Sequence, residues 1–547
     1  MNSAKTEIPS ESSRRTGGSL SPIEIQVLNK TLSAVAEEMG IVLQRSALSP
    51  NIKERRDFSC AVFDGAGRLL AQAAHIPVHL GAMPDTVEMV RRDFTLKPGQ
   101  AVITNDPFAG GTHLPDITLI APVFHEDAGI EPAFYLAARA HHADVGGKYP
   151  GSMSLTTSLE EEGVLITPQI ICDGWQFLEG PLDAIISRMR ASSERAGDLK
   201  AQLSALRRGA DRLVQILDRH GPAPFLGRLS ALLGYGRRFM EAAIAEIPDG
   251  TYLFEDFLDD DGAGNTRIPI RVRLRIEGSK AVVDLSDSAA QVSTCLNATR
   301  SVTRSAVYYC FFCLVGEGYP VNAGSLEPIE VITRPGTICD PEPPAPVAAG
   351  NVETSQRIVD ALFGALSKAL PDRIPAASCG SMNNISLGGT LPDGTEFTYY
   401  ETIGGGMGAR AGADGLSAVQ VHMTNTLNTP VEALEQSYPF LIEEYSIRAG
   451  SGGLGRHKGG DGIVRRYRFL EPASVSILSE RRLIAPYGLH GGGAGKPGRN
   501  VLIKTGPAKA SEEVLPGKCR IEVRAGDCLE IRTPGGGGMG GMEPKEK

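Results

Sequence analysis

The chain has 547 residues, of which 41% are hydrophobic and 22% charged, and its formal net charge is −9 at pH 7. This length exceeds one ordinary domain, so we expect about two to four domains with large buried cores. The acidic balance, with no basic stripe, argues against a nucleic-acid-binding protein. The longest apolar run, residues 306–315, is too short to span a membrane.

The first residues and the cysteines indicate the cellular compartment. Residues 1–20 are polar and rich in serine, which predicts a disordered tail and not a signal peptide. The nine cysteines are scattered without a disulfide framework, as is typical of reduced thiols in a cytoplasmic protein. Cys310 and Cys313 form a lone CxxC inside the apolar run, and there we expect a buried core pair rather than a redox or zinc site.

The first predicted element is a long helix that starts at residue 22. Ser21 can cap it, Pro22 suits the first helical position, and Glu24 can bond back to the cap. We expect the helix to end near residues 46–50. The apolar residues that recur at helical spacing predict one buried face: Ile25, Leu28, Leu32, Val35, Met39 and Val42.

A strand pair follows the helix. Residues 58–63 and 68–72 read as two strands joined by a turn that contains two glycines, and Asp57 stands at the mouth of the first strand. His75 and His79 come next. They are four residues apart, but a proline between them excludes a metal pair on one helical face. A further helix is expected from about residue 84.

Residues 104–151 concentrate histidine and carboxylate side chains. A short strand at 101–104 leads into a glycine-rich loop that ends at His113 and Asp116, and two buried strands follow at 117–124 and 133–142. The chain has 10 histidines. Six of them lie between residues 75 and 142: His75, His79, His113, His125, His141 and His142.

The rest of the chain alternates in texture. Helices are expected from residue 181 to about 248, with a break at Gly221, and strands return from residue 251. The acidic stretch 259–262 is predicted to be a hairpin turn, because it lacks the bidentate glutamate of a calcium loop. Thr354 is predicted to cap a helix that runs to about residue 370.

These elements predict an α+β fold with large mixed multi-stranded sheets, a central helical segment and glycine-rich loops. The chain contains 64 glycines, and they crowd the C-terminal part. We divide it into a tail (1–20), an N-terminal α+β region with the candidate metal site (21–180), a helical segment (181–250), an α+β middle region (251–375) and a glycine-rich, β-dominated region (376–547).

The chemistry favoured by this pattern is metal binding. His113 and Asp116 are three apart in an extended loop, so both can reach one ion, and Asp57 can arrive from the upstream strand. His141 and His142 face opposite sides of a strand, so only one of them can join the same site. Two histidines with two aspartates suit Zn²⁺, Mn²⁺ or Fe²⁺ better than Mg²⁺ or Ca²⁺.

Other site classes have weaker support. The chain lacks a Gly-x-Ser-x-Gly nucleophile elbow and a Gly-x4-Gly-Lys-[Ser/Thr] phosphate loop. Cys60 and Cys379 are better explained as buried structural thiols. A Gly-x-Gly pattern at 404–406 lacks the helix that a dinucleotide site needs.

Several motifs, in order along the chain from about residue 22 to its end, resemble the hydantoinase B/oxoprolinase family. They are Glu-Arg-Arg-Asp-Phe-Ser (54–59), His-Ile-Pro-Val-His-Leu-Gly (75–81), the Asn-Asp-Pro-Phe and Gly-Gly-Thr-His-Leu-Pro-Asp segments (105–116), His-His-Ala-Asp-Val-Gly-Gly (141–147), Asn-Val-Glu-Thr-Ser-Gln-Arg (351–357), the 425–432 segment and the glycine tail 534–541.

The resemblance implies a B-type subunit that pairs with an A-type subunit carrying the ATP site, in a cytoplasmic hetero-oligomer. Such pairs open cyclic amides (hydantoins, 5-oxoproline, lactams) with ATP. It also implies a divalent metal ion in this chain, held by Asp57, His113, Asp116 and, of the histidine pair, His141. On this scheme the partner phosphorylates the amide carbonyl, and metal-held water attacks it.

The resemblance leaves the base and the reaction class open. A base such as His79, Asp144 or Glu162 would steer the proton. Related ketone carboxylases, which act on acetone or acetophenone with ATP and bicarbonate, are the first alternative function. A structural subunit without catalysis of its own is the second.

Overall fold

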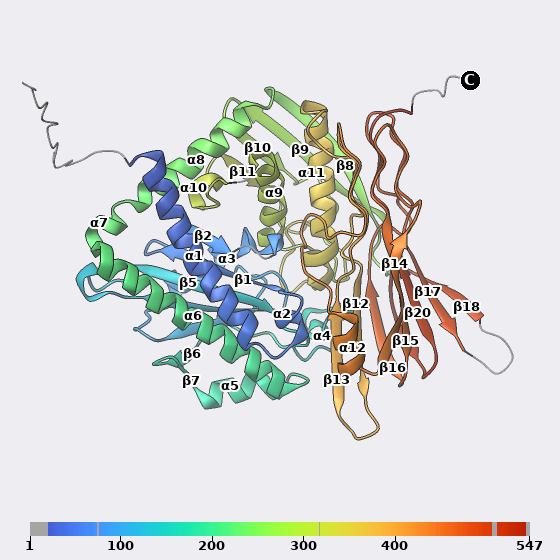
Figure 1. Ribbon diagram of the computed structural model, residues 1–547, viewed down its shortest axis with the longest axis horizontal. Coiled ribbons are helices and arrows are strands. Elements are labelled where there is room, and N and C mark those ends of the chain that lie inside the picture. Colours follow the sequence, from blue (N-terminus) through green and yellow to red (C-terminus); the bar gives the residue numbers. More distant parts are fainter. Residues whose placement is uncertain (1–19, 74–75, 317, 506–510, 543–547) are drawn as a thin grey trace, which may run out of the picture.

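The computed structural model describes residues 20–73, 76–316, 318–505 and 511–542. Residues 1–19 of the predicted tail and His75 lie outside them. The fold is mixed α+β, with 31% helix and 27% strand in several sheets, which confirms the predicted class. Figure 1 shows the helices and the first sheet on one side and the C-terminal strands on the other. Within the described residues, no helix is both long and apolar enough to cross a membrane.

The N-terminal part is built on a seven-stranded sheet of order β2-β1-β5-β4-β3-β6-β7. Helices α1 and α6 lie side by side across one face, and α3 packs on the other (Figure 1). The bounds are α1 Pro22–Ser46, α2 Pro50–Lys53, β1 Phe58–Asp64, β2 Leu69–Ala73, η1 Pro77–His79, α3 Ala82–Asp93, β3 Ala101–Thr104, β4 Asp116–Val123, η2 Glu126–Ala128, β5 Phe134–His141, α4 Leu159–Glu162, β6 Gln169–Asp173 and β7 Gln176–Phe177.

The first helix forms as its sequence predicts. The Ser21 hydroxyl accepts from the Glu24 backbone N–H, the Glu24 carboxylate accepts from the Ser21 backbone N–H, and Pro22 occupies the first turn. The helix ends at Ser46, and its apolar stripe packs on α6 and on the sheet. The strand pair β1–β2 is also confirmed.

The helical segment and the middle sheet follow in chain order. Helices α5 to α8 form the helical segment, and Gly221 separates α6 from α7, as predicted. The middle sheet has the order β11-β10-β9-β8. The bounds are α5 Glu179–Ile186, α6 Ser192–His220, α7 Pro222–Leu226, α8 Leu229–Ala245, β8 Gly250–Asp260, β9 Thr266–Glu277, β10 Lys280–Asp284, α9 Arg300–Val315, α10 Ala323–Leu326, β11 Ile329–Ile332, a π-helical turn η3 at Gly350–Thr354 and α11 Ser355–Ala369.

Two local predictions in this part are wrong and one is confirmed. Thr354 makes no cap hydrogen bond, because helical backbone already begins at Gly350; its hydroxyl donates to the Leu296 carbonyl instead. All nine cysteines are free thiols, but Cys313 is exposed while Cys310 is buried, since the apolar run lies on a helix with one open side. The acidic stretch 259–262 does form the β8–β9 turn.

The C-terminal part contains two sheets that share one core. Their orders are β13-β12-β16-β19 and β14-β15-β20-β17-β18. The bounds are β12 Asn384–Thr390, β13 Glu396–Glu401, α12 Val431–Ser437, β14 Phe440–Arg448, β15 Gly462–Phe469, β16 Ala473–Leu478, β17 Arg499–Lys504, β18 Ser511–Leu515, β19 Lys518–Val523 and β20 Cys528–Arg532.

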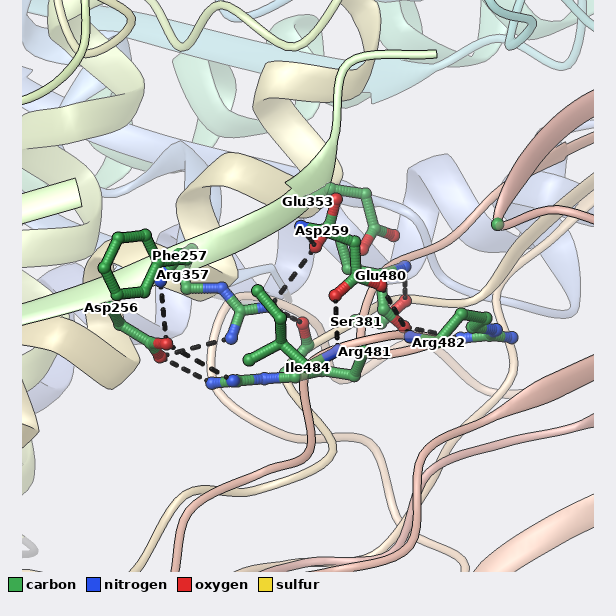
Figure 2. Close-up of polar contacts among 12 residues, drawn as sticks. Asp256, Phe257, Asp259, Glu353, Arg357, Ser381, Glu480, Arg481, Arg482 and Ile484 are labelled. Carbon is green, nitrogen blue, oxygen red and sulfur yellow. Dashed lines mark hydrogen bonds and ion pairs between the residues drawn. The ribbon is translucent and has the colours of Figure 1, made fainter. Parts of the chain in front are cut away.

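A buried ionic network joins this part to the middle sheet (Figure 2). Arg481 donates to the carboxylates of Asp256 on β8 and Asp360 on α11, both at 2.6 Å. Arg357 on α11 lies 3.2 Å from Asp256 and 3.5 Å from Glu480. All these side chains are almost fully buried. The segment around residue 481 is therefore fixed between β8 and α11 by charge.

The glycine-rich tail is a packing element. The backbone N–H groups of Gly536, Gly537 and Gly538 donate to carbonyls of three different loops, at Gly460, Ala377 and Gly493. A Cβ atom on Gly536 would overlap the carbonyl of Met407. Glycine is needed here because backbone approaches backbone without room for a side chain.

Replacing Gly536 by alanine is expected to lower the free energy of unfolding by about 1–3 kcal/mol, because the new methyl group must push one loop away. Urea titration followed by circular dichroism measures this. Gly180→Ala is the matched control, since Gly180 lies in α5 with no atom near its missing Cβ, and we expect it to be neutral or slightly stabilising. Equal effects of the two substitutions would contradict the packing role of Gly536.

Candidate metal centre

Three potential metal ligands converge at the edge of the seven-stranded sheet. Asp116 is the first residue of β4 and His141 the last of β5, and the antiparallel register places them opposite each other. His113 comes from the glycine-rich loop just before β4. His113 Nε2 lies 3.2 Å from His141 Nδ1 and 3.3 Å from Asp116 Oδ1, and His141 Nδ1 lies 3.4 Å from the same oxygen. The strand register thus assembles the cluster.

This geometry fits a small divalent ion. A point equidistant from the three atoms would lie about 1.9 Å from each, close to the roughly 2.0–2.1 Å of zinc–nitrogen bonds. All three residues are buried, and neither Asp116 Oδ1 nor His141 Nε2 has a hydrogen-bond partner. Two imidazoles and one carboxylate are typical of Zn²⁺, Mn²⁺ and Fe²⁺ sites. The residues therefore fit the divalent ion predicted from the sequence.

Neighbouring groups fix the orientation of two of these side chains. His113 Nδ1 donates to the Ala348 carbonyl at 3.3 Å, which leaves its Nε2 lone pair facing the cluster. His79 Nε2 donates to Asp116 Oδ2 at 3.2 Å, and the Thr112 hydroxyl donates to the same oxygen. Asp116 Oδ1 is thereby left free for an ion. His79 thus orients the Asp116 carboxylate, and the Nδ1 atom of His79 accepts from the Ser59 hydroxyl at 2.9 Å.

The electrostatics favour the metal-binding protonation state of Asp116 and His141 but not of His113, because burial would lower the pKa of His113 while the charge of Asp116 raises it above its ordinary value. Burial alone would raise the pKa of Asp116, but the charges of His113 and His79 hold this pKa well below its ordinary value. Burial lowers the pKa of His141. An ionised carboxylate and a neutral imidazole are the forms that bind metals.

His141 is also held from outside the sheet. Its ring stacks on Tyr400 of β13, with centroids 4.7 Å apart and an interplanar angle of 15°. The Arg55 guanidinium lies over the same tyrosine ring at 4.9 Å, and Asn51 donates to the His141 carbonyl. The C-terminal part of the chain therefore contributes to positioning a ligand of the N-terminal sheet.

Asp57 lies beside the cluster, and its carboxylate is not among the three converging groups. Its carbonyl accepts from the His141 backbone N–H at 3.0 Å, and its carboxylate lies 3.9 Å from Arg55. His142 points away, as strand alternation predicts, and lies 3.0 Å from Gln202 of α6. Burial lowers the pKa of His142 to about 4.

Glu162 is a buried carboxyl group with one oxygen held by hydrogen bonds and the other without a partner. Its Oε1 accepts from the backbone N–H groups of Val347 and Ala348, at 2.7 and 2.9 Å, while its Oε2 has no partner. Burial raises the pKa of Glu162 to about 7. Because Ala348 also binds His113, this carboxyl group adjoins the cluster through a single residue.

Asp144 is fully engaged in holding a loop. Its two oxygens accept from the N–H groups of Gly146 and Gly151, both at 2.8 Å, and Arg190 lies 3.2 Å away. This arrangement fixes the turn 146–151 and leaves both carboxylate oxygens of Asp144 occupied.

Residues of the π-helical turn complete the surroundings. Asn351 Nδ2 lies 3.2 Å from His113 Nε2, and its Oδ1 is buried without a partner. Glu353 Oε1 accepts from Asn384, which in turn accepts from the Tyr400 hydroxyl. Sequence motifs had marked residues 351–357 without a role, and no sequence signal pointed to Tyr400 or Ala348.

The pKa of Glu353 predicts a pH dependence of stability. Burial, with a further contribution from Glu480, raises this pKa to about 8 from 4.5. The folded chain then keeps a proton that the unfolded chain has released, so this stabilisation is complete below pH 4.5 and is lost as the pH rises through 8. We expect the free energy of unfolding of Glu353→Gln to fall less steeply than that of the wild type between pH 5 and 8. The two slopes should differ by up to about 1.4 kcal/mol per pH unit.

Urea titrations at several pH values measure this slope. Glu396→Gln, at an exposed position of β13, is the control and should keep the wild-type slope. A Glu353→Gln slope equal to that of the wild type would contradict the raised pKa.

With this geometry established, comparison with known proteins identifies the family. A family model described as hydantoinase B/oxoprolinase matches residues 21–542. The chain belongs to the hydantoinase B/oxoprolinase family. It is 39% identical to 5-oxoprolinase 1 of Arabidopsis thaliana over 553 residues, which cover 95% of this chain and 42% of that protein. It is 29% identical to the B-type subunit of a putative D-/L-hydantoinase from Pseudomonas sp. (strain NS671), over 96% of this chain and 91% of that protein.

Solved structures of this hydantoinase B/oxoprolinase fold agree. The ATP-dependent caprolactamase from Pseudomonas jessenii has a TM-score of 0.88 at 27% identity, covering 96% of this chain and 92% of that chain. Nucleotide-free acetone carboxylase has a TM-score of 0.86 at 18% identity, over 95% and 76%, which shows a shared fold. The chain spans less than half of the 5-oxoprolinase and nearly all of the hydantoinase subunit.

Proposed function

We propose that this chain is the B-type part of an ATP-dependent enzyme that opens cyclic amides such as hydantoins, 5-oxoproline or lactams. The observation that carries the proposal is the buried cluster of His113, Asp116 and His141 in a chain of this family. Relatives named 5-oxoprolinase, hydantoinase subunit and caprolactamase support the substrate class.

Ring opening needs activation from outside this chain. An unstrained five-membered cyclic amide is a poor electrophile, so its carbonyl must be activated before water can attack. The sequence contains no phosphate loop, and the chain spans 42% of the 5-oxoprolinase relative. Both observations support a partner A-type subunit that binds ATP and phosphorylates the carbonyl oxygen, in a hetero-oligomer with this chain.

In this scheme the chain supplies a metal centre and a base. His113, Asp116 and His141 would hold a Zn²⁺, Mn²⁺ or Fe²⁺ ion, and Asp57 stands beside them. Such an ion, when bound, lowers the pKa of a coordinated water. His79 keeps Asp116 turned toward the centre, and Asp144 fixes the turn 146–151.

Glu162 is the base that the contacts favour. Its free Oε2 and a pKa near 7 suit a group that accepts a proton from water as the C–O bond forms and returns it to the ring nitrogen as the C–N bond breaks. The backbone N–H groups of Val347 and Ala348 hold its other oxygen still. His79, in contrast, has both ring nitrogens occupied.

Glu162→Gln tests this assignment. The amide keeps an acceptor for the two backbone N–H groups but cannot take a proton, so we expect turnover to fall about 100-fold or more with metal content unchanged. Turnover is followed as substrate-dependent ADP release by the purified A/B pair, and metal content by mass spectrometry. Glu161→Gln, at the neighbouring partly exposed position, is the matched control. Full activity of Glu162→Gln would remove the glutamate from the mechanism.

The same assay tests the proposed function itself. ADP release by the pair should rise with 5-oxoproline, a hydantoin or a lactam, and the ring-opened product should accumulate. Release that rises only when bicarbonate and a ketone are added would favour the carboxylase alternative. A chain that binds no stoichiometric metal, in a pair whose turnover resists chelators, would favour a structural subunit.

A further inference from the structure

A cavity of about 270 Å³ shares no lining residue with the metal cluster. It lies where α9 and α11 of the middle part meet three loops of the C-terminal part. Its volume lies just below the range of about 300–1,000 Å³ that is typical of ligand pockets, so its occupant must be small. The lining combines polar groups with an apolar wall: Tyr309, Cys313, Leu314, Phe363, Arg373, Ile374, Pro375, Ser378, Met407, Arg410, Gln420, Val421 and His422.

The lining is cationic. It contains two arginines and no carboxylate. Arg373 is already satisfied, because it donates to Glu246 at 2.7 Å and to the Leu314 carbonyl at 2.9 Å. Arg410 is exposed at the cavity and forms no ion pair within the part of the chain that the structure describes. Its guanidinium is therefore free to meet an anion.

His422 supplies a second polar group, and the ionic network lies directly behind it. Its side chain is 7% exposed, and its Nε2 lies 3.5 Å from Asp360 Oδ1. The other oxygen of Asp360 accepts from Arg481 at 2.6 Å, so the carboxylate behind the imidazole belongs to the buried ionic network. Neither Nε2 nor Oδ1 has a hydrogen-bond partner of its own.

The backbone at this residue is strained. His422 has a φ of 56°, in the left-handed region that side chains other than glycine rarely adopt. Such strain persists only where the surrounding structure requires it. Here it places the imidazole between the ionic network and the cavity.

Much of the remaining lining is apolar. The rings of Phe363 and Tyr309 lie 5.6 and 5.9 Å from the imidazole, centroid to centroid. Leu314, Ile374 and Met407 extend this wall. A ligand that contacts both the cationic and the apolar groups would be small, with a flat apolar body and one negative charge.

We propose that this cavity binds a small organic carboxylate, with the carboxylate between Arg410 and His422 and the apolar body against Phe363. The site is separate from the metal centre and independent of the proposed ring-opening function. Binding is therefore measured on the purified full chain, without substrate, ATP or partner.

Benzoate and benzamide are the probes, because they have nearly the same shape and differ in charge. We expect saturable benzoate binding by saturation-transfer NMR or calorimetry. We expect the affinity for benzamide to be lower by at least about tenfold. Arg410→Gln should weaken benzoate about tenfold and leave benzamide unchanged. His422→Asn should also weaken benzoate, and asparagine tolerates the left-handed backbone.

Arg271→Gln, at an exposed arginine of β9 remote in sequence from the cavity, is the control and should bind like the wild type. Thermal unfolding of each variant shows that the fold is kept. The proposal is overturned if benzoate does not bind, if benzoate and benzamide bind equally, or if folded Arg410→Gln binds benzoate as tightly as the wild type.

Discussion

Replacement of Asp116 by asparagine is expected to weaken metal binding by at least about 100-fold and to reduce turnover of the reconstituted pair on the order of 1,000-fold or more. Asparagine has the same shape but lacks the charge that draws an ion to the two imidazoles. Its side chain keeps contacts to His79 and Thr112, so the fold should survive. Metal content of the purified chain by mass spectrometry, and ADP release with substrate, are the two measurements.

His220→Ala is the control for this experiment. His220 lies at the exposed end of α6, and its removal should change neither metal content nor turnover. Thermal unfolding shows whether the Asp116→Asn chain is folded. If the folded variant retains a full equivalent of metal and wild-type turnover, the cluster is not the functional centre.

The largest effect on stability is expected from Arg481→Ala. Arg481 is fully buried and donates to two buried carboxylates, Asp256 and Asp360. Its removal leaves the two buried carboxylates with Arg357 as their remaining guanidinium partner, and we expect a loss of about 3–5 kcal/mol in the free energy of unfolding. The residue also holds a positive φ of 59°, but alanine carries a similar strain, so the charge dominates.

Arg271→Ala is the matched control for this loss. Arg271 pairs with Glu255 on the surface, with exposed fractions of 48% and 38%. Exposed ion pairs contribute about 0–1 kcal/mol, so the control should stay close to the wild type. Urea titration of both variants measures the difference. If Arg481→Ala lowers the free energy of unfolding no more than Arg271→Ala does, the ion pairs of Arg481 do not stabilise the fold.

Local patterns predicted what local forces decide. Ser21, Pro22 and Glu24 encode the start of α1 through contacts within one turn, and the structure shows each of them. Strand alternation separated His141 from His142, because successive residues of a strand face opposite sides regardless of the rest of the fold. The spacing of three residues along one loop predicted that His113 and Asp116 lie together, and their side chains are 3.3 Å apart.

Contacts between distant segments could not be predicted in this way. Asp57 adjoins His141 along the sheet, but its carboxylate lies 3.9 Å from Arg55. Arg55 is itself held by Tyr400 and Thr402, 345 and 347 residues further along the chain. Thr354 has the composition of a cap, yet Gly350 lets the helix start earlier because only a glycine fits against Asn297. Asp144 was a candidate base in the sequence, but its two oxygens are occupied by the N–H groups of Gly146 and Gly151.

The origin of the groups around the metal centre has a consequence for how the chain matures. The three candidate ligands lie within residues 113–141, but two groups that contact His113 lie far along the chain: Ala348 and Asn351 are 235 and 238 residues from it. Closing loops of that length is slow and comes after local structure. The nascent N-terminal sheet therefore carries the candidate ligands before the distant contacts to His113 exist, so an ion bound at this cluster would be held in its final geometry only once the whole chain has folded.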